Sequence, residues 1–428
     1  MYKIYLKQAF ALLRENKLLS LVSVLGTALA ISMIMVIVIV WQVRTASYAP
    51  ETNRDRMLYV KNAMATNIEN KDWCSTSYLS PGLIKRCLYP LKDVEAVGMA
   101  CHFQQRLAGL PDHTLEFKAD VTFTDADFWR VFDFGFLAGK PYTEEEVQSG
   151  IKNAVVCESV ARRLYGTTDV VGREVQISYV PYTIRAVVED VSMLAESAYG
   201  NIWVPYSTDG VGEYSQDEDL LGGFYCYILA KDRSSFDSIR KQTDENVRLL
   251  NTGQVKEVLS LVGAPDTHFA QMIRGIEWEE PDITGMILRY ALIIAILLLI
   301  PAINMSGMTL SRMRKRMSEI GVRKAFGATQ KELVGQVLWE NMLTSLVGGV
   351  VGLIFSYGAI FALGSWLLDA GEMSGYQEGT AFVNAEMMLN PWVFALAFIF
   401  CLLMNLLSAG IPAWRASRMN IVDALNEK

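Results

Sequence analysis

The sequence predicts an α-helical membrane protein with four transmembrane helices, arranged as one plus three, and a large extracytoplasmic mixed α+β domain. Four segments contain no Asp, Glu, Lys or Arg, and each reaches the roughly 20 residues that a helix needs to cross the hydrocarbon core of a bilayer. A long charged stretch, residues 44–289, separates the first segment from the other three. The hydrophobic content of 51% and the mean hydropathy of +0.22 agree with this division.

The four uncharged segments are the expected transmembrane helices. They are Leu18 to Val40, Tyr290 to Leu310, Asn341 to Leu368 and Pro391 to Trp414. Aromatic residues mark their ends, as is typical of membrane interfaces, at Trp41, Tyr290, Trp339, Trp366, Trp392 and Trp414. The first apolar run is longer than the core of a cleaved signal peptide, so we interpret it as a retained anchor. The residues before it have the pattern of an amphipathic helix in the membrane interface.

Basic residues predict the orientation. Seven Lys and Arg lie in the 311–331 loop and four in Met1 to Lys17, whereas the 364–390 connection has none. The positive-inside bias therefore predicts that both termini and the 311–331 loop are cytoplasmic. We expect three domains: residues 1–43 with the amphipathic helix and the first span, residues 44–284 outside, and residues 285–428 with spans two to four and the loop 311–332.

The outer segment is expected to fold as a mixed α+β domain. Alternating or apolar runs predict strands at Leu115 to Phe123, Asn153 to Cys157, Glu174 to Val180, Tyr182 to Val188 and Phe224 to Leu229. Helices are predicted at Glu158 to Tyr165 and at Ser234 to Leu250, where an apolar stripe recurs every three or four residues. With 36 acidic and 25 basic residues over 44–289, this segment argues against a nucleic-acid partner.

The side chains that carry chemistry do not form a known catalytic or metal-binding pattern. The three histidines have no metal-ligand spacing, and the sequence contains no GxSxG, HExxH or GxxxxGK[ST] motif. We therefore expect no catalytic residue, no metal and no ATP hydrolysis in this chain. Five cysteines lie in the outer segment, where disulfides are permitted, but their connectivity stays open. They are Cys74, Cys87, Cys101, Cys157 and Cys226.

The basic segment Arg312 to Glu332 is predicted to be a helix, a tight turn and a second helix. Gly327 is placed to end the first helix, and Thr329 with Glu332 forms a capping box that starts the second. That second helix, Gln330 to Leu368, would be about 58 Å long at 1.5 Å per residue, which exceeds the bilayer thickness. Such an ordered element favours docking of another protein over a merely solvated loop.

Small residues recur every four positions on the third predicted span, at Thr344, Gly348, Gly352 and Ser356. Such a face allows close helix approach and is a candidate dimer interface. Packing within one chain is the alternative.

Two cytoplasmic segments carry a resemblance to a known family. EIGVRKAFGA over residues 319–328 and PAWRASRMNIVDAL over residues 412–425 are similar to signatures of MacB/FtsX-type ABC transporter permeases, although Ile421 stands where proline is usual. In the outer segment, FLAGKP over 136–141, ESVARRLYG over 158–166 and YTIRAVVED over 182–190 resemble the MacB-type periplasmic core. The resemblance spans nearly the whole chain, which looks like a stand-alone permease.

This resemblance implies a multi-pass protein of the bacterial inner membrane that works with two copies of a separate ABC ATPase, on which ATP and Mg would be bound. It implies pairing with a second copy or a homologous permease and contact with membrane lipid. Recruitment of a periplasmic adaptor and an outer-membrane partner stays open from the sequence. The ATPase would dock on the loop, and its motion would be relayed to the outer domain. The coupling residues would be Arg316, Glu319, Ile320, Gly321, Arg323, Lys324, Gly327 and Ala328.

Three functions remain open from the sequence. The first is export or extrusion of a periplasmic substrate. The second is regulation of a cell-wall hydrolase or extraction of lipoproteins, and the third is a membrane-anchored receptor without ATPase coupling. The substrate and the choice between homodimer and heterodimer are not fixed by the sequence.

Overall fold

The computed structural model describes residues 17–208, 219–254, 256–274, 279–293, 295–296, 307, 322 and 325–368, together with single positions between 392 and 414. The described residues form two compact units. The β-rich unit comprises those of 44–286, and the helical unit comprises those before 44 and after 286.

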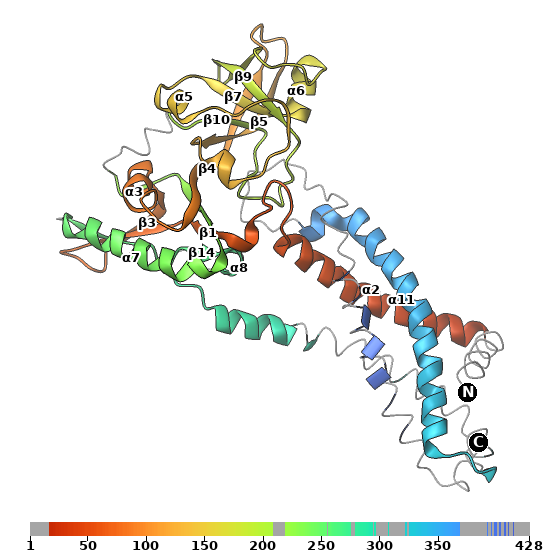
Figure 1. The fold of residues 1–428 in the computed structure, drawn as a ribbon. Helices are drawn as coiled ribbons and strands as arrows, with labels where there is room; N and C mark the ends of the chain where they lie inside the picture. The colour runs from red at the N-terminus through yellow and green to blue at the C-terminus, as the bar shows by residue number, and fades with distance from the viewer. Residues whose placement is uncertain are drawn as a thin grey trace. The chain divides into compact units, whose positions relative to one another are not determined.

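A ten-stranded sheet organises the β-rich unit (Figure 1). Its strand order is β14-β1-β12-β4-β5-β10-β7-β9-β6, and β8 pairs with both β4 and β9. The strands are β1 (Met57–Val60), β4 (Val94–Gly109), β5 (Glu116–Thr124), β6 (Phe136–Gly139), β7 (Asn153–Cys157), β8 (Glu174–Ile177), β9 (Val180–Val188), β10 (Ile202–Pro205), β12 (Tyr225–Ala230) and β14 (Asp266–Thr267).

Burial explains why the middle strands form where they do. All five residues of β7 are buried, because the strand lies between β10 and β9 and is further packed against α6 (Glu158–Tyr165). In the first part of β9, buried and exposed side chains alternate: Tyr182 and Ile184 are buried, and Thr183 and Arg185 are exposed. β7 and β9 pair in parallel, so the chain must cross between them, and α6 lies within that crossover.

A second, four-stranded sheet has the order β11-β3-β2-β13. Its strands are β2 (Ala63–Asn67), β3 (Cys74–Leu79), β11 (Leu221–Gly222) and β13 (Glu257–Ser260). The helix α7 (Phe236–Thr252) contacts β13 and α3 (Pro81–Cys87) through a stripe on which Ile239, Thr243 and Val247 are buried.

Short helices complete the β-rich unit. They are η1 (Arg54–Arg56), α4 (Phe128–Val131), α5 (Glu144–Gln148), η3 (Arg233–Ser235) and α8 (His268–Ile273). The helix α4 can lie directly on β4 because Gly98 has no side chain, since a Cβ there would stand 2.8 Å from the backbone nitrogen of Phe128.

The sequence predictions for this unit agree with the structure in most of their elements. The strand at Asn153–Cys157 and the helix at Glu158–Tyr165 have the predicted bounds. The prediction of one strand through Val180 was wrong in detail, because Ser178 and Tyr179 adopt positive φ and turn the chain between β8 and β9. The mixed α+β class is confirmed for the described residues.

In the helical unit, two helices are long and apolar enough to cross a membrane. They are α2 (Lys17–Thr45) and α11 (Gln330–Leu368), whose qualifying spans are Val24–Thr45 and Gln330–Ile360. A shorter apolar helix covers Ile283–Ile293. Most of the predicted second span and of the fourth lies outside the described residues, so the four-helix arrangement stays a prediction.

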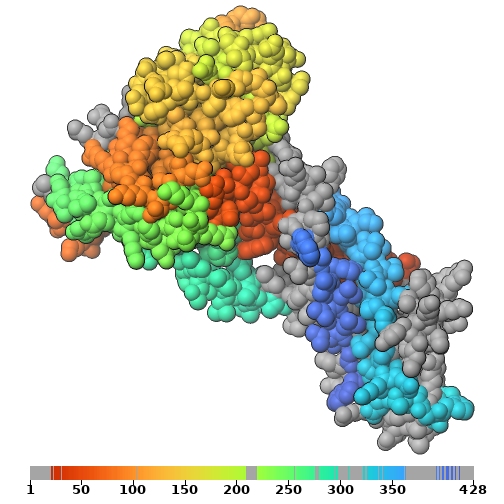
Figure 2. All heavy atoms as spheres, viewed as in Figure 1, coloured from red at the N-terminus to blue at the C-terminus, as the bar shows by residue number. Residues whose placement is uncertain are grey.

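The two long helices expose large apolar side chains on part of their surface and pack against each other through another part. Exposed positions include Leu25, Leu29, Val350 and Ile354, as expected of surfaces that face lipid. Leu353 of α11 packs against a core formed by Ile31 and Met35 of α2, together with Ile34 and Val38. Phe398 lies against α11 at Gly349, and Figure 2 shows described atoms from this late part of the chain beside the helix.

The five described cysteines are free thiols. Cys74 is exposed, and the other four are buried. Burial raises the pKa of the Cys87 and Cys101 thiols to about 11, which keeps them protonated and unreactive. These thiols therefore act as small core side chains.

Candidate functional site

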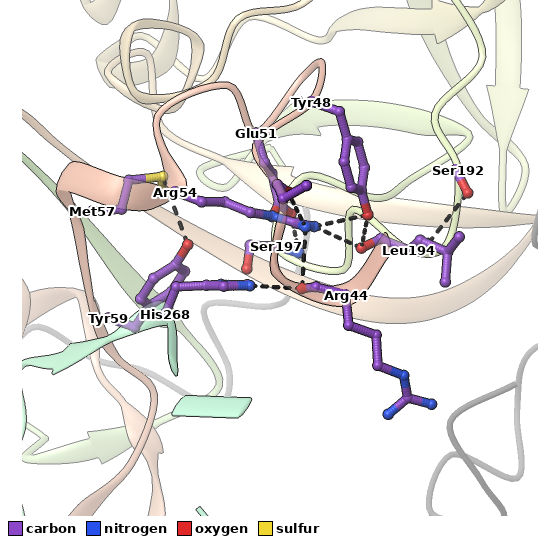
Figure 3. Close-up of polar contacts among 11 residues, drawn as sticks. Arg44, Tyr48, Glu51, Arg54, Met57, Tyr59, Ser192, Leu194, Ser197 and His268 are labelled. Carbon is purple, nitrogen blue, oxygen red and sulfur yellow. Dashed lines mark hydrogen bonds and ion pairs between the residues drawn. The ribbon is translucent and has the colours of Figure 1, made fainter. Parts of the chain in front are cut away.

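A buried polar cluster surrounds the end of α2 where the chain enters the β-rich unit (Figure 3). We call it the anchor cluster, and its members are Arg44, Tyr48, Glu51, Arg54, Leu194, Ser197 and His268. At its centre, Arg54 Nε donates to Glu51 Oε2 at 2.6 Å. The two side chains are only 2% and 1% exposed. A charge pair this deeply buried is retained only where further hydrogen bonds satisfy it.

The other nitrogens of Arg54 hold backbone carbonyls. Its Nη1 donates to Ala46 O at 2.8 Å and to Arg44 O at 3.3 Å. Its Nη2 donates to Leu194 O at 2.7 Å and to Tyr48 Oη at 3.0 Å. The last carbonyls of a helix have no partner within the helix. The Arg54 guanidinium supplies one at the end of α2, and its positive charge also suits the negative end of the helix dipole.

Three further contacts tie the same point to distant parts of the chain. Glu51 Oε1 accepts from the backbone nitrogen of Ser197 at 2.8 Å, and Tyr48 Oη donates to Leu194 O at 2.6 Å. His268 Nε2, at the start of α8, lies 3.0 Å from Arg44 O. Because a carbonyl only accepts, Nε2 must carry the proton. The cluster therefore joins the end of α2, the 192–197 loop and α8.

Electrostatics keep these groups in fixed protonation states. Burial raises the pKa of Tyr48 to about 12, so it remains a donor. Burial lowers the pKa of His268, and the nearby Arg54 charge lowers it further. For Arg54, burial is the largest effect and acts to lower the pKa, but the Glu51 charge, Tyr48 and the hydrogen bond to Glu51 together outweigh it, so the net pKa is raised. Such a cluster has no nucleophile. Its side chains bind backbone carbonyl and amide groups and so fix the position of the chain.

The topology places both ends of the β-rich unit together. β1 begins directly after the anchor cluster, and β14 leads into α8 and then toward the helix Ile283–Ile293. β1 and β14 pair antiparallel through Leu58↔Thr267 and Tyr59↔Asp266. The chain therefore enters and leaves this unit at one edge of the main sheet.

Of the predicted coupling residues, two are described. Arg316, Glu319, Ile320, Gly321, Arg323 and Lys324 lie outside the described residues. Gly327 and Ala328 form the turn that precedes α11, and Gly327 has φ of 91°, the left-handed conformation expected of a helix-ending glycine.

The predicted capping box is present at the start of α11. The backbone nitrogen of Thr329 and its Oγ1 both donate to Glu332 Oε2 at 2.9 Å, and the Glu332 nitrogen donates to Thr329 Oγ1 at 3.4 Å. The turn is thus fixed by local chemistry, whatever its role in docking, which stays a prediction.

The small-residue stripe of α11 packs on α2 of the same chain. A Cβ at Gly352 would stand 2.6 Å from the carbonyl oxygen of Ala28, and one at Gly348 would stand 2.9 Å from the Thr27 side chain. Thr344 and Ser356, which complete the stripe, are also buried. This arrangement corresponds to the alternative of packing within one chain. The dimer contact stays a prediction.

Sequence reasoning did not identify the anchor cluster. The available signal was a Glu and an Arg three residues apart shortly after the first span, which usually indicates an exposed pair. His268 is one of the three histidines that show no metal-ligand spacing in the sequence, and it lies 3.0 Å from Arg44 O. Among the described residues, no group of three or more His, Cys, Asp or Glu side chains could hold a metal ion.

Comparison with known families gives two matches. Residues 20–246 match the MacB-like periplasmic core domain, and residues 291–421 match the FtsX-like permease C-terminal domain. Similar curated proteins include the macrolide export ATP-binding/permease proteins MacB of Chromobacterium violaceum, 25% identical over 311 residues, and MacB 1 of Yersinia pestis, 27% identical over 322 residues. Each alignment covers 73% of this chain and 44% of the relative, so the chain spans about half the length of the curated relatives it matches.

Two solved outer domains are among the structures that this chain matches. The extracellular domain of the noncanonical ABC-type transporter YknZ from Gram-positive bacteria is 14% identical, with a TM-score of 0.33, and covers 46% of this chain and 98% of that one. The periplasmic region of MacB from Actinobacillus actinomycetemcomitans is 16% identical, with a TM-score of 0.34, and covers 50% and 94%.

Proposed function

Because this chain belongs to the MacB/FtsX-type family of ABC transporter permeases, we propose that it relays ATP-driven motion of a separate cytoplasmic ATPase to a periplasmic domain, which moves a substrate out of the envelope. The β-rich unit is the proposed periplasmic domain. ATP and Mg would be bound by the partner, two copies of which would serve a pair of permease chains.

The anchor cluster is the observation that carries this proposal. A relay requires that displacement of a membrane helix reach the outer domain without loss in a flexible linker. Arg54 holds the carbonyls of Arg44 and Ala46, and Glu51 holds the Ser197 nitrogen, so the end of α2 is fixed to the fold through backbone atoms.

The turn before α11 supports the other end of the relay. Gly327 and the Thr329–Glu332 capping box fix the angle at which the chain enters a 39-residue helix. Motion applied to residues 311–328 would therefore act on a rigid rod. The family's ATPases would dock there, at Arg316, Glu319, Ile320, Gly321, Arg323, Lys324, Gly327 and Ala328.

Export is favoured over the other family roles because the curated relatives carry macrolide export in their names. Regulation of a cell-wall hydrolase and extraction of lipoproteins are the alternatives within the family. A periplasmic adaptor and an outer-membrane partner would be needed for export across the whole envelope. Release of a hydrolase activity by ATP, with no change in substrate efflux, would favour the regulator.

A pull-down of the full chain tests the docking step. The variant Glu319→Lys with Arg323→Glu reverses the charges of two predicted coupling residues without altering the net charge, and it should lose the bound ATPase. Arg14→Glu with Glu15→Lys is the matched control, since it is also charge-neutral but lies in the N-terminal flank, and it should retain the ATPase. Equal retention by both variants would reject the docking assignment. A chain that recruits no ATPase at all would favour the receptor.

A further inference from the structure

A strained turn lies between β13 and β14 in the β-rich unit. Val262 has φ of 53° and Gly263 has φ of 76°. Left-handed backbone is easy for glycine but unfavourable for a β-branched residue, whose Cβ crowds the following carbonyl. The other described non-glycine residues with positive φ are Asp93, His113, Ser178 and Tyr179, so Val262 is the β-branched exception among them. It is also buried, at 8% exposure.

A second buried arginine holds this turn. Arg274 pairs with Asp266 through Nε at 2.8 Å and Nη2 at 2.7 Å, and the two side chains are 4% and 5% exposed. Its Nη2 also donates to Val262 O at 3.2 Å. The carbonyl of the strained residue is thus fixed by a guanidinium that a neighbouring carboxylate orients.

The same arginine grips the chain that leaves the unit. Arg274 Nη1 donates to Glu279 O at 2.6 Å, and the Glu280 side chain stands 2.9 Å from where a Cβ of Gly263 would be. Three residues after Glu279, Asp282 Oδ1 accepts from the Gly285 nitrogen at 2.9 Å and caps the helix Ile283–Ile293. The exit chain, residues 279–286, therefore meets the strained turn directly at Gly263 and indirectly through Arg274.

We propose that Arg274 is a positioning residue that latches the exit chain to the strained turn, so that displacement of the exit chain frees Val262 to relax into an extended backbone conformation. The proposal rests on the relay described above and adds to it a part with two states. In the latched state the exit chain, Arg274 and Asp266 hold Val262 in the left-handed region. In the released state the turn relaxes and β14, which starts at Asp266, is no longer fixed from that side.

The latch differs from a passive structural contact in one respect. If Arg274 only stabilised the fold, weakening its grip would have the same effect whichever residue stood at position 262. If it holds strain, the effect must depend on that residue, because glycine adopts φ of 53° without strain. The coupling between positions 262 and 274 is therefore the diagnostic quantity.

Hydrogen exchange of the full-length chain in lipid nanodiscs measures this coupling. Arg274→Lys keeps a charge for Asp266 but loses the fork that reaches two carbonyls at once. In the wild-type background it should accelerate exchange of the Ala264 amide, which donates to Leu261 O at 3.0 Å, by about tenfold. In the Val262→Gly background the acceleration should fall below about threefold. Equal acceleration in both backgrounds would overturn the latch.

Two further measurements separate the latch from general unfolding and from the relay. Protection of the buried strand β7 against hydrogen exchange should be unchanged in Arg274→Lys. Gly263→Ala should also accelerate hydrogen exchange at the strained turn, because it adds a Cβ at positive φ without altering Arg274. With the ATPase bound, ATP should accelerate exchange at the turn. If ATP alters other parts of the β-rich unit but leaves the turn unchanged, the latch is rejected and the relay stands. If ATP alters nothing while the coupling persists, the relay fails and the strained latch remains.

Discussion

Replacing Arg54 by alanine should lower the free energy of unfolding of the β-rich unit by about 3–5 kcal/mol. The substitution leaves Glu51, whose side chain is 1% exposed, as a buried charge without its partner. It also removes a donor from the carbonyls of Arg44, Ala46 and Leu194. Arg44 O keeps His268 Nε2 and Leu194 O keeps Tyr48 Oη, so the Ala46 carbonyl bears most of the further loss, about 1–3 kcal/mol where water does not replace the donor. The range for a broken buried pair is therefore the expected size of the effect.

Urea unfolding of the full chain in detergent measures this loss. Near-ultraviolet circular dichroism follows the β-rich unit, since Trp129 and Trp203 lie in its aromatic core with ring centroids 6.0 Å apart. Glu51→Gln should be milder than Arg54→Ala, because the single amide oxygen keeps an acceptor for either Arg54 Nε or the Ser197 nitrogen, Arg54 keeps its backbone partners, and no unpaired anion is left.

The matched control is Arg248→Ala. Arg248 also pairs with a glutamate three residues away, Glu245, but the two side chains are 65% and 51% exposed, so its loss should be below about 1 kcal/mol. The same spacing and the same residue types thus sit in opposite environments within one domain. If Arg54→Ala costs no more than Arg248→Ala, the anchor cluster does not hold α2 to the fold.

Three other predictions concern the α2–α11 contact in the helical unit, the Gly327 turn before α11, and the pH dependence of stability. Gly352→Ala should lower the thermal stability of the full chain in detergent, since its Cβ would stand 2.6 Å from the Ala28 carbonyl, whereas Gly358→Ala on the same helix meets nothing within 4 Å and should be neutral or stabilising. A loss shared by both variants would contradict the α2–α11 contact. Gly327→Ala, at φ of 91°, should destabilise the turn before α11 by about 1–2 kcal/mol and reduce ATPase binding. Gly335→Ala, which meets nothing within 4 Å, is its control. Unchanged ATPase binding in Gly327→Ala would show that the turn is not needed for docking. Burial raises the pKa of Asp125 to about 7, so the wild-type fold loses stability as pH rises from about 4 to about 7. In urea titrations, Asp125→Asn should therefore gain stability relative to the wild type across that window, by up to about 1.4 kcal/mol per pH unit. A difference in unfolding free energy that does not vary with pH would refute this.

Local sequence chemistry predicted those elements whose cause is local. The capping box at Thr329 and Glu332 needs only the right side chains three residues apart, and it forms as expected. The β7 strand could be predicted to the residue because a buried central strand reads as a short apolar run, here Ala154 to Cys157 after Asn153.

β4, at 16 residues the longest strand, was missed for a physical reason. Its sequence contains Gly98, two adjacent glutamines and His102, which together break any alternation. The strand exchanges partners along its length, pairing with β12 first and later with β5 and β8, and its register with β5 shifts between Cys101 and Gln104. Each part therefore meets different surroundings, and a single period cannot describe it.

The anchor cluster could not be predicted because its partners are backbone atoms. The carbonyl of Leu194, 140 residues from Arg54, carries no sequence signal. Only the local pair with Glu51 is visible in the sequence, and that pair alone does not distinguish a buried contact from an exposed one.

Arginine is used at both ends of the β-rich unit because backbone carbonyls must be bound there. A buried ion pair adds little stability over a well-packed apolar pair, so stability alone does not explain Arg54 with Glu51 or Arg274 with Asp266. An apolar side chain, however, cannot bind a carbonyl. Each of these arginines uses its carboxylate partner for orientation and its remaining nitrogens to grip backbone, at Ala46 and at Glu279.

Displacement of either chain end therefore acts on the backbone of two adjacent strands. β1 and β14 share only the pairs Leu58↔Thr267 and Tyr59↔Asp266, and β14 has no strand on its other side in the described sheet. A two-residue edge strand has few pairing contacts, so its local opening costs the least free energy. Opposed displacement of the two ends should separate β14 from β1 before it disturbs the long central pairing of β4 with β5. The exit side is thus where the fold should yield first, and the strained turn that precedes β14 lies at that point.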